Sequence, residues 1–330
     1  MNFNTELELI NNILKDDLTK VNNLILLKMQ NKVELIPTIG NYLIKSGGKR
    51  IRPLLTLLCS KVFNYQGNSD ILLSACIEFI HSATLLHDDI VDDNTSRRGF
   101  TTSNVIWGNK SCILVGDYLF SKAFELMVEA NNLEILAVLS KASSTIAQGE
   151  IMQLSNLNNL NLSLQDYTDT IFAKTASLFS ASTKMGSLLT EQSSFIKECI
   201  ENYGINLGMS FQIFDDILDY SSTKQKLGKE IGTDMKEGKI TLPIILSLQE
   251  CNNTEKDFLN DVFCNLNIKE DTLQKVIDLI TKYDAFTKSC SIAQTYADKA
   301  VDNINDISID NNIFKEKLIC LAKSSIKRTS

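Results

Sequence analysis

The chain has 330 residues, of which 44% are hydrophobic, 22% are charged and three are proline, with a formal net charge of −7 and a pI near 5.1. This acidity argues against nucleic-acid binding, because contacts with phosphate need a basic surface. So few prolines favour long helices, in a chain with enough apolar residues for a sizeable core.

The eight cysteines are scattered and form no C-x-x-C pair. This spacing argues against an ordinary zinc site and suits reduced thiols in a cytoplasmic protein. The polar and acidic start, MNFNTELELINNILKDDL, does not resemble a signal peptide. We find no run of about 18 apolar residues and therefore expect no transmembrane segment.

Helical periodicity begins at once. Residues 3–28 form an amphipathic pattern, and we expect residues 1–30 to pack on the protein or contribute to a dimer contact. A second helix is predicted over 35–45, with Gly47 as a left-handed cap. Pro53 stands where a first-turn proline is tolerated, in a helix that continues to Val62. After a turn, the central helix is predicted over 71–92.

Residues 94–109 and 221–239 are polar and glycine-containing, and we interpret both as loops. Further helices are predicted over 111–130, 134–154, 164–189, 193–220, 242–250, 254–266, 271–285, 288–307 and 313–325. No stretch alternates long enough to predict a strand. The pattern predicts an all-α fold: a single-domain orthogonal helical bundle over residues 1–330, with a central apolar cavity.

The central helix ends in an aspartate cluster made of Asp88, Asp89 and Asp92. An α-helix advances about 100° per residue, so His81, Asp88 and Asp92 share one face. Crowded carboxylates repel one another unless a cation lies among them, and paired carboxylates suit Mg²⁺. Alone, such a cluster is also typical of a solvated acidic helix end.

A second cluster, Asp215, Asp216 and Asp219, stands in the sequence FQIFDDILDY far along the chain. Both clusters follow apolar helical runs, whereas a solvated face would mix lysine with glutamate. The pair therefore indicates a shared multi-metal site.

These motifs resemble those of the trans-type polyprenyl diphosphate synthases, and most closely the long-chain bacterial octaprenyl type that makes quinone side chains. The resemblance extends from about Val33 onward. It includes Gly47-Gly48-Lys49-Arg50-Ile51-Arg52-Pro53, Arg97-Arg98-Gly99, Gly116-Asp117-Tyr118-Leu119, Gly149-Glu150 with Gln153, Lys174-Thr175-Ala176, Phe211-Gln212, and Gly228-Lys229 through Lys239-Ile240-Thr241-Leu242-Pro243.

The resemblance implies a Mg²⁺-dependent homodimeric prenyltransferase that adds isopentenyl diphosphate to an allylic, farnesyl-like diphosphate. It implies that the two aspartate clusters hold Mg²⁺ around the allylic diphosphate, and spacing favours the first and last aspartate of each. Isopentenyl diphosphate would be bound by Lys49, Arg52, His81 and Arg98. The allylic diphosphate and developing cation would contact Arg97, Lys174, Thr175, Gln212, Lys229 and Lys239.

Two hypotheses concern the fate of the substrate. The loop with Lys229 and Lys239 would close over bound substrate and exclude water. An apolar tunnel would start at the small residues Ala83 and Thr84, one turn below Asp88, and hold the growing chain. Candidates for its wall are Cys76, Phe79, Ile80, Phe120 and Phe124, each of which also suits an ordinary core.

Three other readings remain open. A terpene cyclase would ionise the same allylic diphosphate without an isopentenyl pocket. A metal-dependent phosphohydrolase is suggested by His87-Asp88 but would need more histidines than the two present. A non-catalytic synthase subunit would typically lack one aspartate cluster. The oily product leaves open a peripheral membrane contact for its release.

Overall fold

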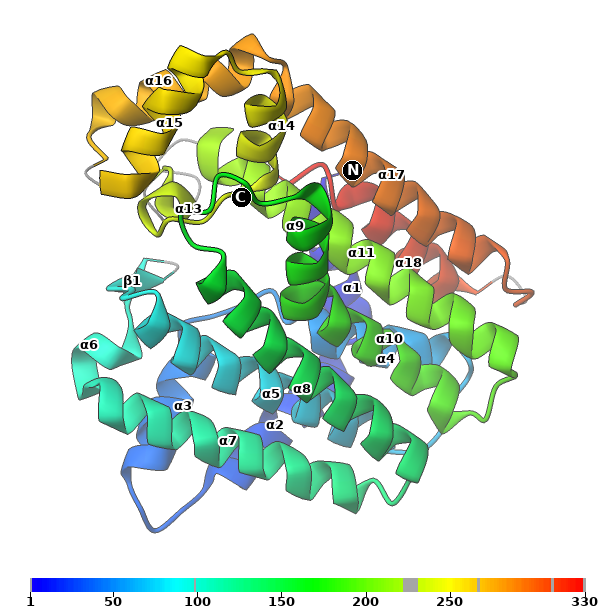
Figure 1. Cartoon of the computed structure of the whole chain (residues 1–330). Helices are drawn as coiled ribbons and strands as arrows, with labels where there is room; N and C mark the ends of the chain where they lie inside the picture. The colour runs from blue at the N-terminus through cyan, green and yellow to red at the C-terminus, as the bar shows by residue number, and fades with distance from the viewer. Residues whose placement is uncertain (1, 98, 222–230, 266–267, 310–311, 329–330) are drawn as a thin grey trace.

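The computed structural model describes residues 2–97, 99–221, 231–265, 268–309 and 312–328. Within these ranges the protein is almost entirely helical (Figure 1), which confirms the predicted all-α fold. The elements are α1 (Phe3–Ile13), α2 (Lys15–Met29), α3 (Leu35–Lys45), α4 (Ile51–Val62), α5 (Ser69–Val91), β1 (Ser96–Arg97), β2 (Phe100–Thr101), α6 (Ser103–Trp107), α7 (Asn109–Glu129), α8 (Leu133–Ser155), α9 (Leu164–Ile171), η1 (Phe172–Ala176), α10 (Ser177–Leu189), α11 (Ser194–Ser221), α13 (Thr233–Lys236), α14 (Leu242–Glu250), α15 (Asn253–Asn265), α16 (Glu270–Lys282), α17 (Ala285–Asn305) and α18 (Ile313–Ser324).

The strongest local signals predicted their helices well. α3 has the predicted bounds, and Gly47 just beyond it adopts a φ of +76°, the left-handed conformation that glycine tolerates without a steric penalty. α5 covers almost the whole of the predicted central helix. A glycine at the helix end and sustained apolar periodicity were therefore sufficient to predict the positions of these two helices.

Four predicted segments differ from the structure, and one of them is the loop expected over 221–239, which contains the short helix α13. The single helix expected over 3–28 is interrupted at Leu14, whose ψ of 14° separates α1 from α2. The loop expected over 94–109 contains a small antiparallel hairpin, β1 with β2, followed by α6. The continuous helix expected over 164–189 contains the π-helical turn η1, which divides α9 from α10.

The buried side chains form two hydrophobic clusters that share two long helices. The first cluster joins α1 to α8 with α10, and the second joins α9 with α13 to α16. The helices α11 and α17 pack against each other and contribute to both clusters (Figure 1). Tyr203 of α11 is buried in the first cluster and Tyr220 in the second, so α11 fixes the two parts relative to each other.

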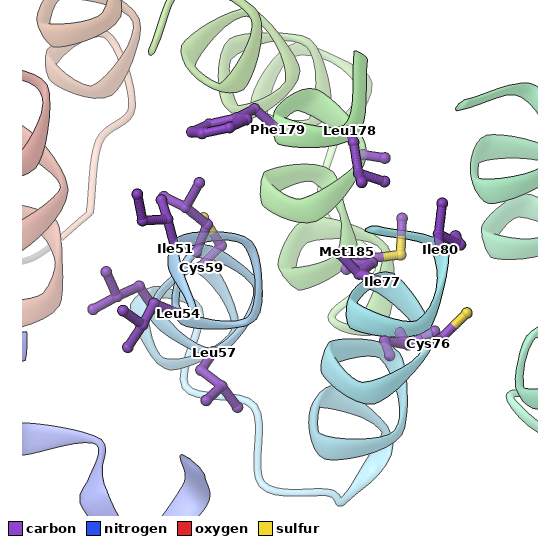
Figure 2. Close-up of a cluster of buried hydrophobic side chains, with 14 of the residues drawn as sticks. Ile51, Leu54, Leu57, Cys59, Cys76, Ile77, Ile80, Leu178, Phe179 and Met185 are labelled. Atoms are coloured by element: carbon purple, nitrogen blue, oxygen red, sulfur yellow. The ribbon is translucent and has the colours of Figure 1, made fainter. Parts of the chain in front are cut away.

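The first cluster is centred on α4, α5 and α10, and Figure 2 shows buried side chains from each of these helices. Leu54 of α4, Ile77 of α5 and Met185 of α10 are completely buried there. Burying side chains of this size stabilises the folded state by roughly 1.5–3 kcal/mol each relative to exposure. The N-terminal helix α1 packs on α18 and α2 and buries Phe3 against the same cluster.

Among the described helices, α5 alone is long and apolar enough by length and composition to cross a membrane, although the sequence predicted no such segment. In the structure, 67% of its apolar window is buried inside the protein. The central core helix of a bundle passes the same test, because it is apolar on all sides.

Candidate active site

A cleft of about 720 Å³ is lined by residues of α4 and α5 together with residues of η1 and α11. It collects most of the residues that the sequence predicted for a site. These are Lys49, Arg52, His81, Asp88, Asp92, Arg97, Lys174, Thr175, Gln212, Asp215 and Lys239. Arg98 and Lys229 lie outside the described residues.

The first aspartate cluster is arranged as helical spacing predicted. Asp88 and Asp92 line the cleft, and Asp89 is turned away and only 4% exposed. The Asp89 carboxylate accepts hydrogen bonds from Arg97 at 2.8 Å to Nε and 2.7 Å to Nη2. Arg97 comes from β1, so this pair fixes the hairpin to the end of α5. Asp89 is therefore placed to hold the hairpin rather than to face the cleft.

Asp88 is the carboxylate of this cluster whose charge is least compensated. Burial raises its pKa to about 7, against the lowering effect of Lys174, and Glu150 raises it further. Among the described residues we find no hydrogen-bond donor to the Asp88 carboxylate. A buried carboxylate of this kind favours the approach of a cation.

The second cluster is arranged differently from the first. Asp215 lines the cleft, and its carboxylate accepts a hydrogen bond from Arg328 at 2.7 Å. Asp216 is buried, and its two oxygens accept hydrogen bonds from Tyr167 at 2.6 Å and Gln212 at 2.8 Å. Burial raises the pKa of Asp216 to about 8, and neighbouring Asp234 raises it further.

Asp219 departs from the expectation that the last aspartate of each cluster faces the metal. It is 8% exposed, and its carboxylate accepts the backbone N–H groups of Thr233 at 3.2 Å and Asp234 at 3.1 Å. These donors open the short helix α13, whose free N–H groups attract a carboxylate. Asp219 thus positions α13, which brings Asp234 to the cleft.

Basic residues occupy the neighbouring part of the cleft. The Arg52 guanidinium lies 4.8 Å from the centre of the Phe179 ring and 3.3 Å from Nε2 of His81. Lys49 lies 5.6 Å from the ring of Phe3, which comes from α1. Arginine and lysine collected in this way suit an anionic group such as a diphosphate.

His87 lies outside this arrangement. Its Nε2 is 3.2 Å from the carbonyl of Ile113 and 3.5 Å from Asp117, both on α7. The histidine of the His87-Asp88 pair therefore does not join Asp88 at the cleft, which disfavours the phosphohydrolase reading.

The π-helical turn η1 presents two consecutive residues to the cleft. Lys174 donates to Glu150 at 2.6 Å and to Gln153 at 2.7 Å, both on α8. Thr175 donates to Gln212 at 2.8 Å, on α11. Gly149 permits this close packing, since a Cβ there would lie 2.6 Å from the backbone nitrogen of Lys174.

Lys239 connects the two sides of the cleft. Its Nζ donates to Asp92 at 2.9 Å and to Glu237 at 2.6 Å. Burial alone would lower the pKa of Lys239, but the carboxylates of Asp234, Asp92 and Glu237 raise it above its usual range. Lys239 is therefore a fully charged group between the two aspartate clusters.

Several residues were not predicted as part of the site, namely Glu150, Asp234, Glu237 and Arg328, which line the cleft, and Tyr167, which is bonded to Asp216. Asp234 and Glu237 stand in the lysine-rich loop, and their three-residue spacing was a usable signal. Tyr167 and Arg328 carried none, because each is distant in sequence from the aspartates that it contacts.

The donor set fits a divalent metal bound together with a diphosphate. Within the described ranges, no group of three or more His, Cys, Asp or Glu residues forms a ready-made metal site. Mg²⁺ typically takes only one or two protein carboxylates and completes its shell with water and phosphate oxygens. Asp88, Asp92 and Asp215 line one cleft and supply carboxylates of that kind.

Known proteins resemble the chain over nearly its whole length. Residues 33–280 match the family model described as polyprenyl synthetase. An octaprenyl diphosphate synthase of Escherichia coli (strain K12) is 35% identical over 322 residues, which cover 98% of this chain and 99% of that protein. A geranylgeranyl diphosphate synthase of Saccharolobus solfataricus is 34% identical over 294 residues, with coverage of 87% and 88%. The structure of a polyprenyl synthase from Caulobacter crescentus, complexed with calcium and isoprenyl diphosphate, matches with a TM-score of 0.93 and 38% identity over 98% of each chain.

Proposed function

The chain belongs to the polyprenyl synthetase family and is a trans-prenyltransferase, and from this premise we propose that it condenses isopentenyl diphosphate head-to-tail onto an allylic diphosphate in a Mg²⁺-dependent reaction. The observation that carries this proposal is the single cleft shared by Asp88, Asp92 and Asp215, with basic residues beside them. Residues 1–330 would act as one synthase domain.

The carboxylates would hold the metal ions at the allylic diphosphate. Asp88, Asp92 and Asp215 are the direct ligands that the cleft geometry supports, and Asp89, Asp216 and Asp219 would act through the residues that they hold. When bound, Mg²⁺ neutralises the charge that develops on the leaving diphosphate. Arg97, Lys229 and Lys239 would contribute positive charge to the same group.

The isopentenyl diphosphate pocket would be formed by Lys49, Arg52, His81 and Arg98. The packing of Arg52 on Phe179 and against His81 pre-orients its guanidinium, which reduces the cost of ordering it when the diphosphate binds. This pocket favours a synthase over a terpene cyclase, because a cyclase has no second diphosphate to bind.

Lys174, Thr175 and Gln212 would line the path between the two substrates. The hydrogen bond from Thr175 to Gln212 holds the two side chains together, and Gln212 is in turn oriented by Asp216. Oxygen dipoles fixed in this way stabilise a developing allylic cation without reorganising during the reaction.

We propose a long-chain, octaprenyl-like product of the type used for quinone side chains. Relatives making octaprenyl and geranylgeranyl diphosphates are almost equally identical to this chain, so similarity alone does not choose a length. The support is the small size of the residues below Asp88: Thr84 lines the cleft, and Ala83 is fully buried beside it. Phe124 does not suit the predicted tunnel wall, since it is 46% exposed on α7.

The loop 221–239 would close over the bound substrates. Residues 222–230, which include Lys229, lie outside the described residues, and the described remainder already reaches Asp92 through Lys239. Amide exchange in this loop should slow when Mg²⁺ and an unreactive diphosphate analogue bind. Exchange that does not change would contradict the closure.

A homodimer is the assembly that the surface supports. Apolar side chains are exposed along neighbouring faces of α6, α7 and α8, namely Val105, Ile106, Ile113, Leu114, Phe124, Val128, Leu133, Ile151 and Leu154. Exposed apolar side chains that gather on helices in mutual contact are a feature of protein interaction surfaces. α1 contributes to internal packing, and so we place the dimer contact on α6 to α8.

The cysteines, the burial of α5 and the net charge bear on where the protein acts and with what it associates. A cytoplasmic location suits the eight cysteines, all of which are free thiols. The burial of α5 supports its role as a core helix rather than a transmembrane segment, and product release would use at most a peripheral membrane contact. The surface charge gives no support for a nucleic-acid partner.

One assay tests the proposed activity directly. The purified protein is incubated with Mg²⁺, farnesyl diphosphate and labelled isopentenyl diphosphate, and the products are separated by length. We expect a polyprenyl diphosphate of octaprenyl length that requires both substrates and the metal. A hydrocarbon formed from the allylic substrate alone would instead indicate a terpene cyclase, and the absence of any product would contradict both.

A further inference from the structure

Arg328 follows α18 and lies against the second aspartate cluster. Its side chain is only 1% exposed, and all three of its nitrogen positions are used. Nη1 donates to Asp215 at 2.7 Å, Nη2 to the Phe211 carbonyl at 2.6 Å, and Nε to the Ser325 carbonyl at 2.9 Å. No cation in this position was predicted from the sequence.

Aromatic rings enclose the same guanidinium. It lies 3.8 Å from the ring centre of Phe211, 5.4 Å from that of Phe214 and 5.7 Å from that of Phe3. Phe3 also contacts Phe211, with 5.9 Å between ring centres. Side chains from α1 and α11 thus enclose Arg328 at the edge of the cleft, which Phe211 and Arg328 both line.

This burial distinguishes Arg328 from the other cations that pair with the aspartates. Arg97 on Asp89 is 26% exposed, and Lys239 on Asp92 is 12% exposed at the end of a flexible stem. Those cations can turn toward an incoming diphosphate. Arg328 would first have to break two hydrogen bonds to backbone carbonyls and leave its aromatic surroundings, so it stays where it is.

We propose that Arg328 is a positioning residue that fixes the carboxylate of Asp215 for binding of the metal and diphosphate. Asp215 is 44% exposed and lines the cleft, so its carboxylate remains accessible while Arg328 holds one oxygen. The proposal rests on the proposed function, because it assigns Asp215 to the metal-diphosphate site.

Two opposite effects of the guanidinium must be weighed. Its positive charge repels a nearby metal ion, which would weaken metal binding. Its hydrogen bond fixes the ligand oxygen, and loss of a group that orients a metal ligand typically weakens metal binding by about 10- to 100-fold. The fixed, fully hydrogen-bonded geometry makes positioning the larger effect.

The test compares Arg328→Met and Arg328→Lys with Lys327→Met. Lys327 is the adjacent cation and is exposed, so its replacement removes the same charge without touching Asp215. Binding of Mg²⁺ is measured by calorimetry on protein saturated with an unreactive thio analogue of farnesyl diphosphate. The KM values for both substrates and the melting temperature are measured in parallel.

We expect Arg328→Met to weaken Mg²⁺ binding by about 10-fold or more. Arg328→Lys should fall between Arg328→Met and wild type, because lysine restores the charge but not the three-way hydrogen bonding. Lys327→Met should match wild type, and in both Arg328 variants the KM for isopentenyl diphosphate should change less than the Mg²⁺ affinity.

Three outcomes would overturn the proposal. Unchanged or tighter Mg²⁺ binding in Arg328→Met would mean that positioning is not the larger effect. A lower melting temperature with normal Mg²⁺ binding would indicate a structural role only. A selective rise in the KM for isopentenyl diphosphate would make Arg328 a contact of that substrate.

If Arg328→Met does not fold, Arg328→Lys becomes the deciding variant. A wild-type Mg²⁺ affinity in Arg328→Lys would contradict the proposal, because it would mean that the three hydrogen bonds of the guanidinium are not needed. An inactive wild type would reject the proposed function instead.

Discussion

The ammonium group of Lys239 lies 2.9 Å from the carboxylate of Asp92, although 147 positions separate the two residues in the chain. This ion pair connects the helix of the first aspartate cluster to the loop that follows the second. In the proposed function, Lys239 would exchange this carboxylate for a phosphate oxygen when substrate binds.

Replacing Lys239 with methionine should therefore affect the allylic substrate most. We expect kcat/KM for the allylic diphosphate to fall by about 100-fold or more, since a fixed donor to developing charge is lost. The KM for isopentenyl diphosphate should change little. Steady-state kinetics with Lys275→Met, which removes an exposed lysine of α16, provide the control. Equal losses for both substrates would contradict this assignment.

The raised pKa of Asp88 predicts a specific pH dependence. Its pKa is about 7 in the folded protein, so below this pH the folded state holds a proton that the unfolded chain releases above about pH 4. The protonated Asp88 side chain contributes to the free energy of unfolding. This contribution is fully present below the unfolded pKa and is lost as the pH rises through the folded pKa. Metal-free wild type should melt below Asp88→Asn by a margin that is small at about pH 5 and clearly larger at about pH 8.

Thermal melting at the two pH values measures this difference. Added Mg²⁺ with a diphosphate analogue should stabilise the wild type more at the higher pH, because the metal binds the ionised carboxylate. A difference between wild type and Asp88→Asn that is independent of pH would contradict the assignment.

Tyr167→Phe tests the hydrogen bond that holds Asp216. The substitution removes the donor and leaves a buried oxygen without its partner, which should lower the free energy of unfolding by about 1–3 kcal/mol. The activity should fall as well, because Asp216 orients Gln212. Urea unfolding measures the stability, with Tyr296→Phe as the control. A neutral effect on both would mean that Asp216 does not depend on Tyr167.

Ala83→Tyr tests the start of the product tunnel. The added ring should block the growing chain and shorten the product. Because Ala83 is fully buried, overpacking should also destabilise the protein by about 1–3 kcal/mol. Thr84→Phe, at the cleft, should shorten the product with a smaller loss of stability. Ser291→Tyr on the exposed face of α17 is the control. Product length that is unchanged in both Ala83→Tyr and Thr84→Phe would refute the tunnel position.

The dimer proposal predicts that charges on α7 separate the subunits. Leu114 and Val128 are 68% and 67% exposed, and an aspartate at both positions would have to be buried without a partner. We expect the double variant to sediment as a monomer. Phe195→Asp, at an equally exposed phenylalanine on α11, should leave the assembly unchanged. A wild type that is already monomeric would refute the proposal.

Sequence reasoning predicted the elements and residues whose signals are local. The face shared by Asp88 and Asp92 followed from helical spacing alone, and the bounds of α3 followed from its glycine cap. The break at Leu14 was not predictable, because no glycine or proline marks it and helical hydrogen bonds continue on both sides of it.

The second aspartate cluster shows why the rest was not predictable. Its spacing matches the first, yet Asp216 faces Tyr167 and Asp219 faces the start of α13. Those partners come from other parts of the chain, and spacing within one helix does not contain their positions. Arg328 was missed for the same reason.

The turn η1 has a consequence for which lengths of this segment can function. Lys174 and Thr175 are consecutive, so their side chains diverge, and they contact different helices: Lys174 contacts α8 and Thr175 contacts α11. The wider π turn is a rare feature often found at functional sites. It accommodates one additional residue, and it therefore shifts the angular positions of the side chains around the helix axis. Deleting one residue here would restore an unbroken helix that still buries its apolar face, but it would rotate the lysine and threonine out of phase with α8 and α11. The irregularity therefore acts as a spacer that sets the angular phase of two chemical groups.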